Sequence, residues 1–293
     1  MTVVRLPSTA SPQEVTAALR VNGYVIVDNL APDGLMDRIN AEMAPYVGDT
    51  SYCPDGFLGH KTKRTGRLIA RSPAARELIM NKMVLGAAEL FLEKSTTFQL
   101  HLTQIISVFP GSEIQPLHRD EGAWDFFPFP IDFDPMCNVL WAMSEYTEDM
   151  GATRVVPFSH LDDRADYTND DSISAEMSRG SALFYTGKVV HGAGANVSDR
   201  LRQAINITYS RGWLRQEENQ YLSTPLEIAK ILPEDLLRVM GYQPACFSMG
   251  YVGEYEDPIS VVRPEFAKSM TITDIQSKEA ESEAAAAVLK AVV

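Results

Sequence analysis

The sequence predicts a mainly β fold with helical additions, an antiparallel barrel or double sheet of the jelly-roll type. Three observations support this fold class. The first third of the chain shows helical periodicity, the pattern changes to the alternation of strands after Lys94, and it becomes helical and polar again after Trp213. Short strands with helices at both ends are typical of a β core buttressed by N-terminal and C-terminal helices. We find no internal repeat and no linker, so residues 1–293 are expected to form a single domain.

The N-terminal part should contain three helices and one strand. Residues 11–20 begin with a capping serine and a first-turn proline, residues 33–46 carry a buried stripe, and the stretch from 72 to 91 has apolar residues at helical spacing. The β-branched segment 23–27 predicts a strand. Residues 47–71 lack periodicity and predict a long loop. Its basic residues, which we interpret as a solvated face or a subunit contact, are Lys61, Lys63, Arg64, Arg67 and Arg71.

The middle of the chain predicts a series of short strands. They are expected at 97–108, 138–144, 153–157, 181–185 and 203–209. In the first of them, His101 has a parity unlike that of Phe98, Leu100 and Leu102, and we favour a structural role for it over a place in a polar cavity. The chain from 270 onward is expected to be a peripheral helix or tail.

Composition excludes several partners. Acidic residues outnumber basic ones 39 to 26, which gives a net charge of −13 and disfavours nucleic acid and anionic membranes. The chain has no apolar run of 18 residues and no signal peptide, so a cytoplasmic location is expected. The three cysteines have no metal-ligand spacing, which indicates free thiols.

A His-x-Asp motif is the first candidate metal site. Residues two apart on an extended segment present their side chains to one face, so His118 and Asp120 can bind one metal. A second, distant imidazole would complete the two-His, one-carboxylate arrangement of non-haem iron sites. We favour His191, which follows a predicted strand and precedes the small residues 192–194. His160 is the competing candidate.

Arg202 lies eleven residues after His191, at the start of a predicted strand. A guanidinium group matches the planar geometry of a carboxylate and keeps its charge at every physiological pH. A metal site combined with a carboxylate anchor suggests a keto-acid cosubstrate. A surface arginine paired with one of the many acidic residues is the alternative.

Taken together, these motifs give the sequence a family resemblance. The segments "NGYVIVDNL", "QPLHRD", "GATRVVPFSHL" and "GSALFYTGKVVHGAGANVSDRLRQAINITYSRGW" resemble the phytanoyl-CoA dioxygenase family of iron(II)- and 2-oxoglutarate-dependent oxygenases. The resemblance is weakest in 47–71 and after Asn219. It implies a double-stranded β-helix, a cupin-like jelly roll with helices packed outside.

The resemblance also implies roles for individual residues. His118, Asp120 and His191 would bind iron, and Arg202 would hold the distal carboxylate of 2-oxoglutarate. Two further positions match cosubstrate contacts in the family, namely Gln115 and Thr153, although either side chain could simply satisfy local backbone groups. Because Asp120 is present, no coordination position is vacated for chloride, and halogenation is disfavoured.

The implied reaction couples oxidative decarboxylation of 2-oxoglutarate, with O2, to removal of a substrate hydrogen. Hydroxylation is the default outcome, and desaturation or rearrangement are variants of it. We expect an apolar small-molecule metabolite as the substrate. The alternatives are a fatty acyl-CoA 2-hydroxylase of the phytanoyl-CoA type, a non-catalytic cupin-like metal- or ligand-binding protein, and a hydrolase that uses the metal to activate water.

Aromatic residues suggest where the substrate would bind. The segment 124–130 lies just past the proposed ligands and is too aromatic for an ordinary exposed loop, so Phe127 is a candidate pocket residue. Trp213 and Tyr209, at the end of the Arg202 strand, are two further candidates. A dimer contact explains the aromatic segment equally well, so a homodimer is the alternative expectation.

Overall fold

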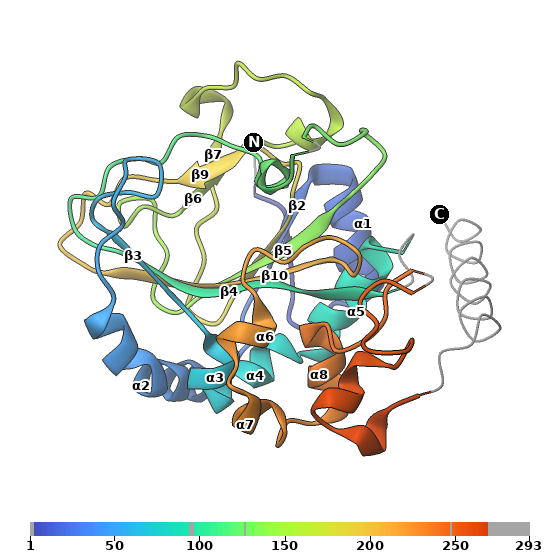
Figure 1. Cartoon of the computed structure of the whole chain (residues 1–293). Helices are drawn as coiled ribbons and strands as arrows, with labels where there is room; N and C mark the ends of the chain where they lie inside the picture. Colours follow the sequence, from blue (N-terminus) through green and yellow to red (C-terminus); the bar gives the residue numbers. More distant parts are fainter. Residues whose placement is uncertain (1–2, 94–96, 126, 247, 269–293) are drawn as a thin grey trace.

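The computed structural model describes residues 3–93, 97–125, 127–246 and 248–268, which form a mixed α/β structure built on two sheets (Figure 1). The larger sheet has seven strands in the order β1-β2-β8-β5-β10-β4-β3, and the smaller has three in the order β7-β6-β9. Only the β1–β2 pair is parallel among the pairings of these strands. A sheet core with helices at both ends of the chain is therefore confirmed, with more helix than a mainly β fold implies.

The strands occur close to the predicted positions. The larger sheet comprises β1 (Arg5–Leu6), β2 (Tyr24–Val27), β3 (Thr62–Gly66), β4 (Phe98–Val108), β5 (Met136–Ala142), β8 (Ala182–Thr186) and β10 (Arg202–Arg211), and the smaller comprises β6 (Thr153–Val155), β7 (Ile173–Ser174) and β9 (His191–Ala193). The sequence did not reveal β1, β7 and β9, because strands of two or three residues are too short to show alternation.

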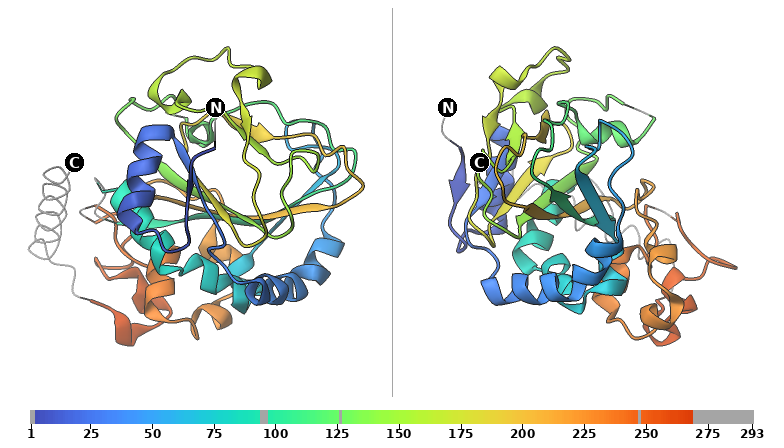
Figure 2. Two further views of the ribbon diagram at one scale, coloured as in Figure 1. Left: turned by 180° about the vertical axis from the view of Figure 1, so that it is seen from behind. Right: turned by 90° about the vertical axis from the view of Figure 1, so that its left-hand side faces the viewer.

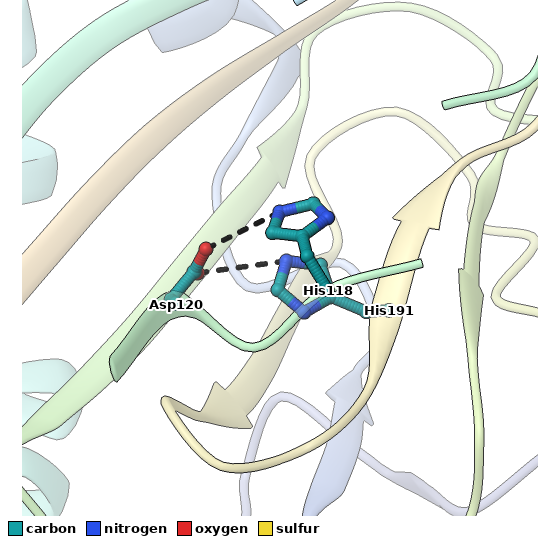
Figure 3. Close-up of side chains that lie close together, drawn as sticks. All are labelled: His118, Asp120 and His191. Carbon is teal, nitrogen blue, oxygen red and sulfur yellow. Dashed lines mark ion pairs between the residues drawn. The ribbon is translucent and has the colours of Figure 1, made fainter. Parts of the chain in front are cut away.

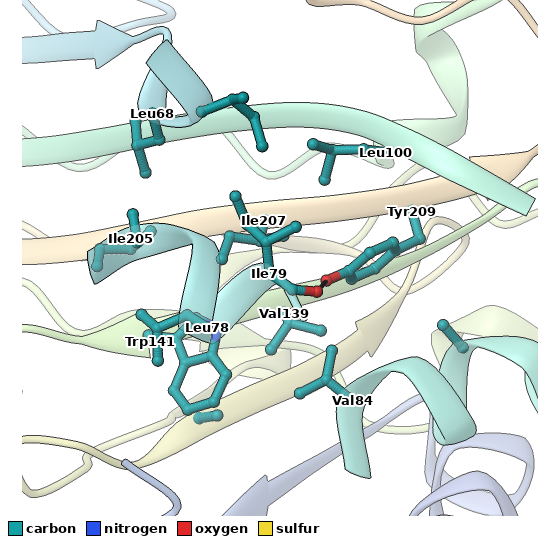
Figure 4. Close-up of a cluster of buried hydrophobic side chains, with 14 of the residues drawn as sticks. Leu68, Leu78, Ile79, Val84, Leu100, Val139, Trp141, Ile205, Ile207 and Tyr209 are labelled. Atoms are coloured by element: carbon teal, nitrogen blue, oxygen red, sulfur yellow. Dashed lines mark hydrogen bonds between the residues drawn. The ribbon is translucent and has the colours of Figure 1, made fainter. Parts of the chain in front are cut away.

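The helices pack on one face of the larger sheet, and the smaller sheet lies over the other face (Figures 1 and 2). They are α1 (Pro12–Asn22), α2 (Asp33–Asp49), α3 (Leu68–Arg71), α4 (Pro73–Ile79), α5 (Lys82–Phe91), α6 (Gln220–Ser223), α7 (Leu226–Ala229) and α8 (Glu234–Met240). The helix-side core includes Trp141, and Tyr209 donates from its hydroxyl to the carbonyl of Ile79 at 2.6 Å (Figure 4). This packing covers one face of the larger sheet with apolar side chains.

The start of α1 follows the expected capping rule, and one expected helix is corrected. Ser11 caps α1 in a capping box with Glu14. The single helix expected from 72 to 91 is two helices, because the chain breaks at Met80 and Asn81 caps α5 by accepting from the backbone N–H groups of residues 83 and 84. An asparagine at an N-cap satisfies donors that a continuous helix would pair internally, so it starts a new helix.

The long loop expected at 47–71 is also corrected. Its second half contains β3, which pairs with β4, and then the short helix α3. The β3 strand is polar and only partly buried, so it lacks the apolar alternation that identifies a strand from sequence. The basic cluster is therefore not one solvated face, since Arg64 on β3 lines the cavity described below.

After β10 the chain forms α6, α7 and α8 as expected, and α8 joins the helix-side core. The expected helix or tail from 270 onward lies outside the described residues. Cys53 and Cys137 are free thiols, as predicted. Among the helices of the described ranges, none combines the length and apolar character that crossing a bilayer requires.

Candidate metal centre

The predicted His-x-Asp segment lies directly beside β9. His118 and His191 form an isolated antiparallel bridge: the N–H of each donates to the carbonyl of the other, at 2.9 and 3.0 Å. Gln115 adds a further backbone bond, from its N–H to the carbonyl of Ala193 at 2.9 Å. Asp120 does not continue this extended run but begins a short 3-10 helix, Asp120–Ala123. The pairing thus brings together two histidines that are far apart in sequence.

The three predicted ligands form one cluster (Figure 3). His118 Nε2 lies 3.5 Å from Asp120 Oδ1, and His191 Nε2 lies 3.5 Å from Asp120 Oδ2. One ligand atom from each residue lies within 4.8 Å of the others. Ligands that share one ion at about 2.1 Å are separated by about 3 Å, so small side-chain adjustments would let all three bind the same ion.

Both imidazoles are oriented for metal binding. His118 Nδ1 lies 2.9 Å from the carbonyl of Pro116, and His191 Nδ1 lies 3.1 Å from the carbonyl of Val189. A carbonyl can only accept, so each Nδ1 carries a proton and donates it. The Nε2 lone pairs then face the cluster, the arrangement that metal-binding histidines usually show.

The electrostatics favour the metal-binding protonation states of His191 and Asp120. Burial lowers the pKa of His191 to about 4, against the opposing charge of Asp120. Burial acts in the same direction on His118, but the hydrogen bond and charge of Asp120 raise the pKa of His118 above its ordinary value. Burial would raise the pKa of Asp120, yet the two histidines hold that pKa well below its usual range. An ionised carboxylate beside a neutral imidazole is ready to bind a cation.

A glycine allows the two segments to approach. A Cβ on Gly192 would lie 2.9 Å from the carbonyl oxygen of Gln115 and 3.3 Å from that of Pro116. These distances are too short for an alanine at this position without movement of the backbone. The sequence interpretation of residues 192–194 as small residues that permit close backbone approach is confirmed at Gly192.

Arg202 is a buried cation on β10. Its side chain is 1% exposed, its Nε and Nη2 donate to the carbonyl of Gly151 at 3.2 and 2.8 Å, and its guanidinium lies 4.5 Å from the ring centroid of Tyr146. The hydroxyls of Tyr146 and Thr153 are hydrogen-bonded at 2.8 Å. Within the described ranges, Arg202 forms no ion pair with a carboxylate. Its predicted alternative, a surface pairing with an acidic residue, is therefore wrong.

The cluster opens into a cavity of about 500 Å³ on the sheet face opposite the helices. Its lining combines polar and apolar groups: Phe57, Leu58, Arg64, His101, Leu102, Gln104, Gln115, His118, Arg119, Asp120, Gly122, Ala123, Met136, Asn138, Asn206, Thr208 and Glu217. Gln115 lines it while its side-chain oxygen accepts from the N–H of Ala193 at 3.1 Å. The cavity is large enough for a small molecule.

Two cavity residues escaped the sequence interpretation. Arg64 lines the wall, and its Nε is buried without a hydrogen-bond partner in the part of the chain that the structure describes. His101 is 1% exposed and also lines the cavity, so the structural role favoured for it is incomplete and the polar-cavity alternative applies. The unusual parity of His101 in its strand was the sequence signal for a place in the cavity. The sequence gives no such signal for Arg64, because Arg64 lies in a stretch without periodicity.

The remaining predicted residues lie elsewhere. His160, the competing metal ligand, is buried near α1 with its Nε2 3.0 Å from the carbonyl of Arg20, and it is not part of the cluster. Phe127 and Trp213 are 50% and 39% exposed and do not line this cavity. The role of Phe127 and Trp213 in substrate binding stays a prediction. The prediction of Tyr209 as a pocket residue is wrong, because Tyr209 is buried in the helix-side core, where its hydroxyl donates to the carbonyl of Ile79.

Comparison with known proteins places the chain in a defined family. Residues 19–204 match the family model described as Phytanoyl-CoA dioxygenase (PhyH), which is more than half of the chain. The chain is 32% identical over 291 residues to the dioxygenase cnsJ of Penicillium expansum, covering 89% of this chain and 86% of that one. It is 28% identical over 267 residues to the dioxygenase FrzG of a Cladobotryum species, covering 82% and 87%.

Solved structures show the same fold. The carbocyclase SnoK from nogalamycin biosynthesis, described as non-heme and alpha-ketoglutarate dependent, aligns with a TM-score of 0.59 at 18% identity, covering 73% of this chain and 92% of that one. HygX from Streptomyces hygroscopicus, with nickel and 2-oxoglutarate bound, aligns with a TM-score of 0.58 at 14% identity, covering 70% and 89%.

Proposed function

The chain belongs to the phytanoyl-CoA dioxygenase family and is an iron(II)- and 2-oxoglutarate-dependent dioxygenase, and we propose that His118, Asp120 and His191 bind its iron. The observation that carries the ligand assignment is the cluster itself. Two Nε2 atoms and one carboxylate converge from an extended segment and from β9, with each imidazole fixed through its Nδ1. Two histidines and one carboxylate leave coordination positions open for the cosubstrate and O2.

We assign the binding of 2-oxoglutarate chiefly to Arg202. A buried guanidinium without a carboxylate partner in the described chain is suited to an anionic ligand, because desolvated charges require pairing. Thr153 is hydrogen-bonded to Tyr146, over whose ring the Arg202 guanidinium lies, and Gln115 lines the cavity and accepts from the N–H of Ala193 on β9. Arg64 adds a second positive group on the cavity wall.

Iron(II) in this family supplies the activation of O2 coupled to decarboxylation of 2-oxoglutarate to succinate and CO2. The residues of this chain bind and orient the reactants. Arg202 sits at 1% exposure, where an ion pair with a carboxylate would be strong because water is excluded. Hydroxylation is the proposed outcome, and desaturation or rearrangement remain variants of the same hydrogen removal.

We propose a small-molecule metabolite of secondary metabolism as the substrate. SnoK, which shares the fold, is described as acting in nogalamycin biosynthesis, and the cavity of about 500 Å³ is of a size to hold such a compound. An acyl-CoA substrate would require a site for several phosphate groups, which the net charge of −13 does not favour.

The architecture supports two further proposals. The two facing sheets are consistent with a double-stranded β-helix, and one hydrophobic core extends from Val15 on α1 to Val262 near the end of the described chain, which supports a single domain. A homodimer and a cytoplasmic location stay predictions.

One experiment tests the function. The purified protein should bind 2-oxoglutarate and Fe(II) together under anaerobic conditions, seen as a charge-transfer absorption, and release succinate once O2 is admitted. Absence of both signals would contradict the proposal and favour the non-catalytic cupin-like alternative. Product formation without O2 would favour a metal-dependent hydrolase instead.

A further inference from the structure

His101 occupies a β-bulge that turns its side chain into the cavity. Along the β4–β10 pair, Leu102 is paired with Thr208 and Leu100 with Tyr209, so the register shifts and His101 is the extra residue. Leu100 belongs to the helix-side core, whereas His101 and Leu102 both line the cavity. A bulge of this kind re-aims a side chain that regular alternation would send to the other face.

The surroundings of His101 fix which nitrogen carries its proton. The backbone N–H of Glu217 donates to His101 Nδ1 at 3.3 Å, so this nitrogen accepts and the ring proton is on Nε2. The imidazole also packs against Trp124, with 4.9 Å between ring centroids. His101 Nε2 is buried and makes no hydrogen bond to the described residues. Since buried N–H groups are usually hydrogen-bonded, this donor on the cavity wall is available to a ligand atom.

The carboxylate of Glu217 provides the matching acceptor. Its Oε2 lies 3.5 Å from His101 Nε2, and its side chain is 57% exposed and lines the same cavity. The neighbouring Glu218 fastens this segment to the bulge: its N–H donates to the carbonyl of His101 at 3.0 Å, and its carboxylate accepts from the N–H of Thr103 at 2.9 Å. The donor and the acceptor are therefore held side by side by backbone contacts.

We propose that His101 and Glu217 bind a hydroxyl group of the substrate, an inference that rests on the proposed dioxygenase function. A hydroxyl oxygen accepts from His101 Nε2 and donates its proton to the Glu217 carboxylate, so one group satisfies both partners. A carbonyl would satisfy only the histidine and would place a second acceptor beside a carboxylate. The substrate class is thus an alcohol or a phenol.

The sheet places this hydroxyl site away from the metal ligands. Leu102 on β4 is paired with Thr208 on the neighbouring strand β10, and Thr208 is paired with Asn138 on the next strand, β5. Since neighbouring strands lie about 4.8 Å apart, Leu102 and Asn138 are separated by roughly 10 Å. Asn138 contacts Asp120 at 3.1 Å. The proposed hydroxyl site therefore lies on β4, two strands away from Asn138, whose amide contacts Asp120.

Three probes of one shape test the site: 1-indanol, 1-methoxyindane and indane. Their dissociation constants are measured by equilibrium dialysis with the full-length protein loaded with Fe(II) and 2-oxoglutarate under anaerobic conditions. We expect 1-indanol to bind roughly tenfold more tightly than indane, because it gains hydrogen bonds to buried or charged groups. 1-Methoxyindane, which accepts but cannot donate, should lie between them.

Substitutions assign the preference to the two residues. His101→Leu should abolish the preference for 1-indanol over indane, and His101→Gln, which keeps an N–H donor, should restore part of it. Glu217→Gln should reduce the difference between 1-indanol and 1-methoxyindane. Leu102→Val is the matched control on the same wall and should change the binding of all three probes by the same factor.

The outcomes separate this inference from the proposed function. If the wild-type protein binds 2-oxoglutarate but does not bind 1-indanol more tightly than indane, only the hydroxyl site is overturned. The same conclusion follows if the preference for 1-indanol persists in both His101→Leu and Glu217→Gln. A wild-type protein that fails to bind 2-oxoglutarate overturns the dioxygenase proposal itself. If His101→Leu does not fold, the half-exposed Glu217→Gln and the conservative His101→Gln decide the question.

Discussion

The side-chain amide of Asn138 donates to the carboxylate of Asp120, with 3.1 Å between Asn138 Nδ2 and Asp120 Oδ2. Asn138 is itself fixed, because its Oδ1 accepts from Thr208 Oγ1 at 2.6 Å. The same oxygen, Asp120 Oδ2, accepts the hydrogen bond from Asn138 and lies 3.5 Å from His191 Nε2. The strands β5 and β10 thus orient the one carboxylate of the metal cluster, although neither strand contributes a metal ligand.

Replacing Asn138 by leucine should therefore weaken iron binding. Groups that orient metal ligands typically change affinity 10- to 100-fold when they are lost, and we expect Asn138→Leu to fall in that range. Anaerobic titration of the metal-free protein with Fe(II) measures it. Thr208→Val keeps the Asn138 amide but removes the hydroxyl that donates to it, so this variant should lose less iron affinity. A folded Asn138→Leu variant with unchanged affinity would contradict this role.

Arg202→Lys should raise the KM for 2-oxoglutarate at least about tenfold, with a smaller change in kcat. Lysine keeps the charge but loses the planar pair of donors that matches a carboxylate. Steady-state kinetics with 2-oxoglutarate as the varied substrate measures the effect. Arg211→Lys is a matched control: Arg211 is also buried on β10, but its Nε donates to the carbonyl of Asp134 at 2.7 Å. Equal KM values in the two variants would show that Arg202 is not the anchor.

The three residues of the metal cluster and Arg202 could be predicted from sequence because their order and spacing along the chain are distinctive. His101 and Arg64 could not. A bulge changes the face of a side chain without changing residue type, so alternation indicates only that His101 is irregular. Arg64 lies on β3, which pairs with the sequence-distant strand β4. The residues of β3 are polar and do not alternate, so the sequence does not identify the strand. Both residues owe their place in the cavity to tertiary pairing.

A buried ion pair next to the metal cluster should be sensitive to loss of one partner. Lys188 and Glu121 are 3% and 2% exposed, with Lys188 Nζ 3.2 Å from Glu121 Oε2 and 3.0 Å from the carbonyl of Phe129. Lys188→Met leaves a buried carboxylate unpaired, which should cost about 3–5 kcal/mol in the free energy of unfolding.

The double variant Lys188→Met with Glu121→Gln is the control for that experiment. It removes both charges, so it should be more stable than Lys188→Met alone when both are unfolded in urea at neutral pH. If the double variant were instead the less stable of the two, the buried charge of Glu121 would not be the cause of the loss.

His160 should make the folded protein less stable in mild acid. Burial lowers the pKa of His160 below 6.5, and the charges of Arg119 and Lys188 lower this pKa further. The backbone hydrogen bond to Arg20 and the charge of Asp162 act in the opposite direction but do not cancel the effect. The unfolded chain therefore binds a proton near pH 6.5 that the folded chain does not yet bind. The free energy of unfolding should fall as pH decreases below about 6.5, and should be unaffected by this group above it.

The variant His160→Gln isolates that contribution. Glutamine retains an N–H donor for the carbonyl of Arg20 but does not titrate, so the decrease in stability between pH 7 and pH 5 should be shallower than in the wild type. Urea unfolding at several pH values measures both curves. Parallel curves would mean that burial does not shift the titration of His160.

Gly192→Ala should reduce iron affinity more than tenfold by moving a ligand. The added Cβ would lie 2.9 Å from the carbonyl oxygen of Gln115, so the extended segment that carries His118 must shift away from β9. That shift breaks the backbone bridge between His118 and His191 and separates the two Nε2 atoms. Fe(II) titration and the Tm measure the two consequences independently. Gly48→Ala on α2 is the matched control, since its Cβ would meet nothing within 4 Å and helical alanine is favoured by up to about 1 kcal/mol. It should keep iron affinity and raise the Tm slightly, and a Gly192→Ala variant that behaved in the same way would refute the close pairing of the two histidine segments.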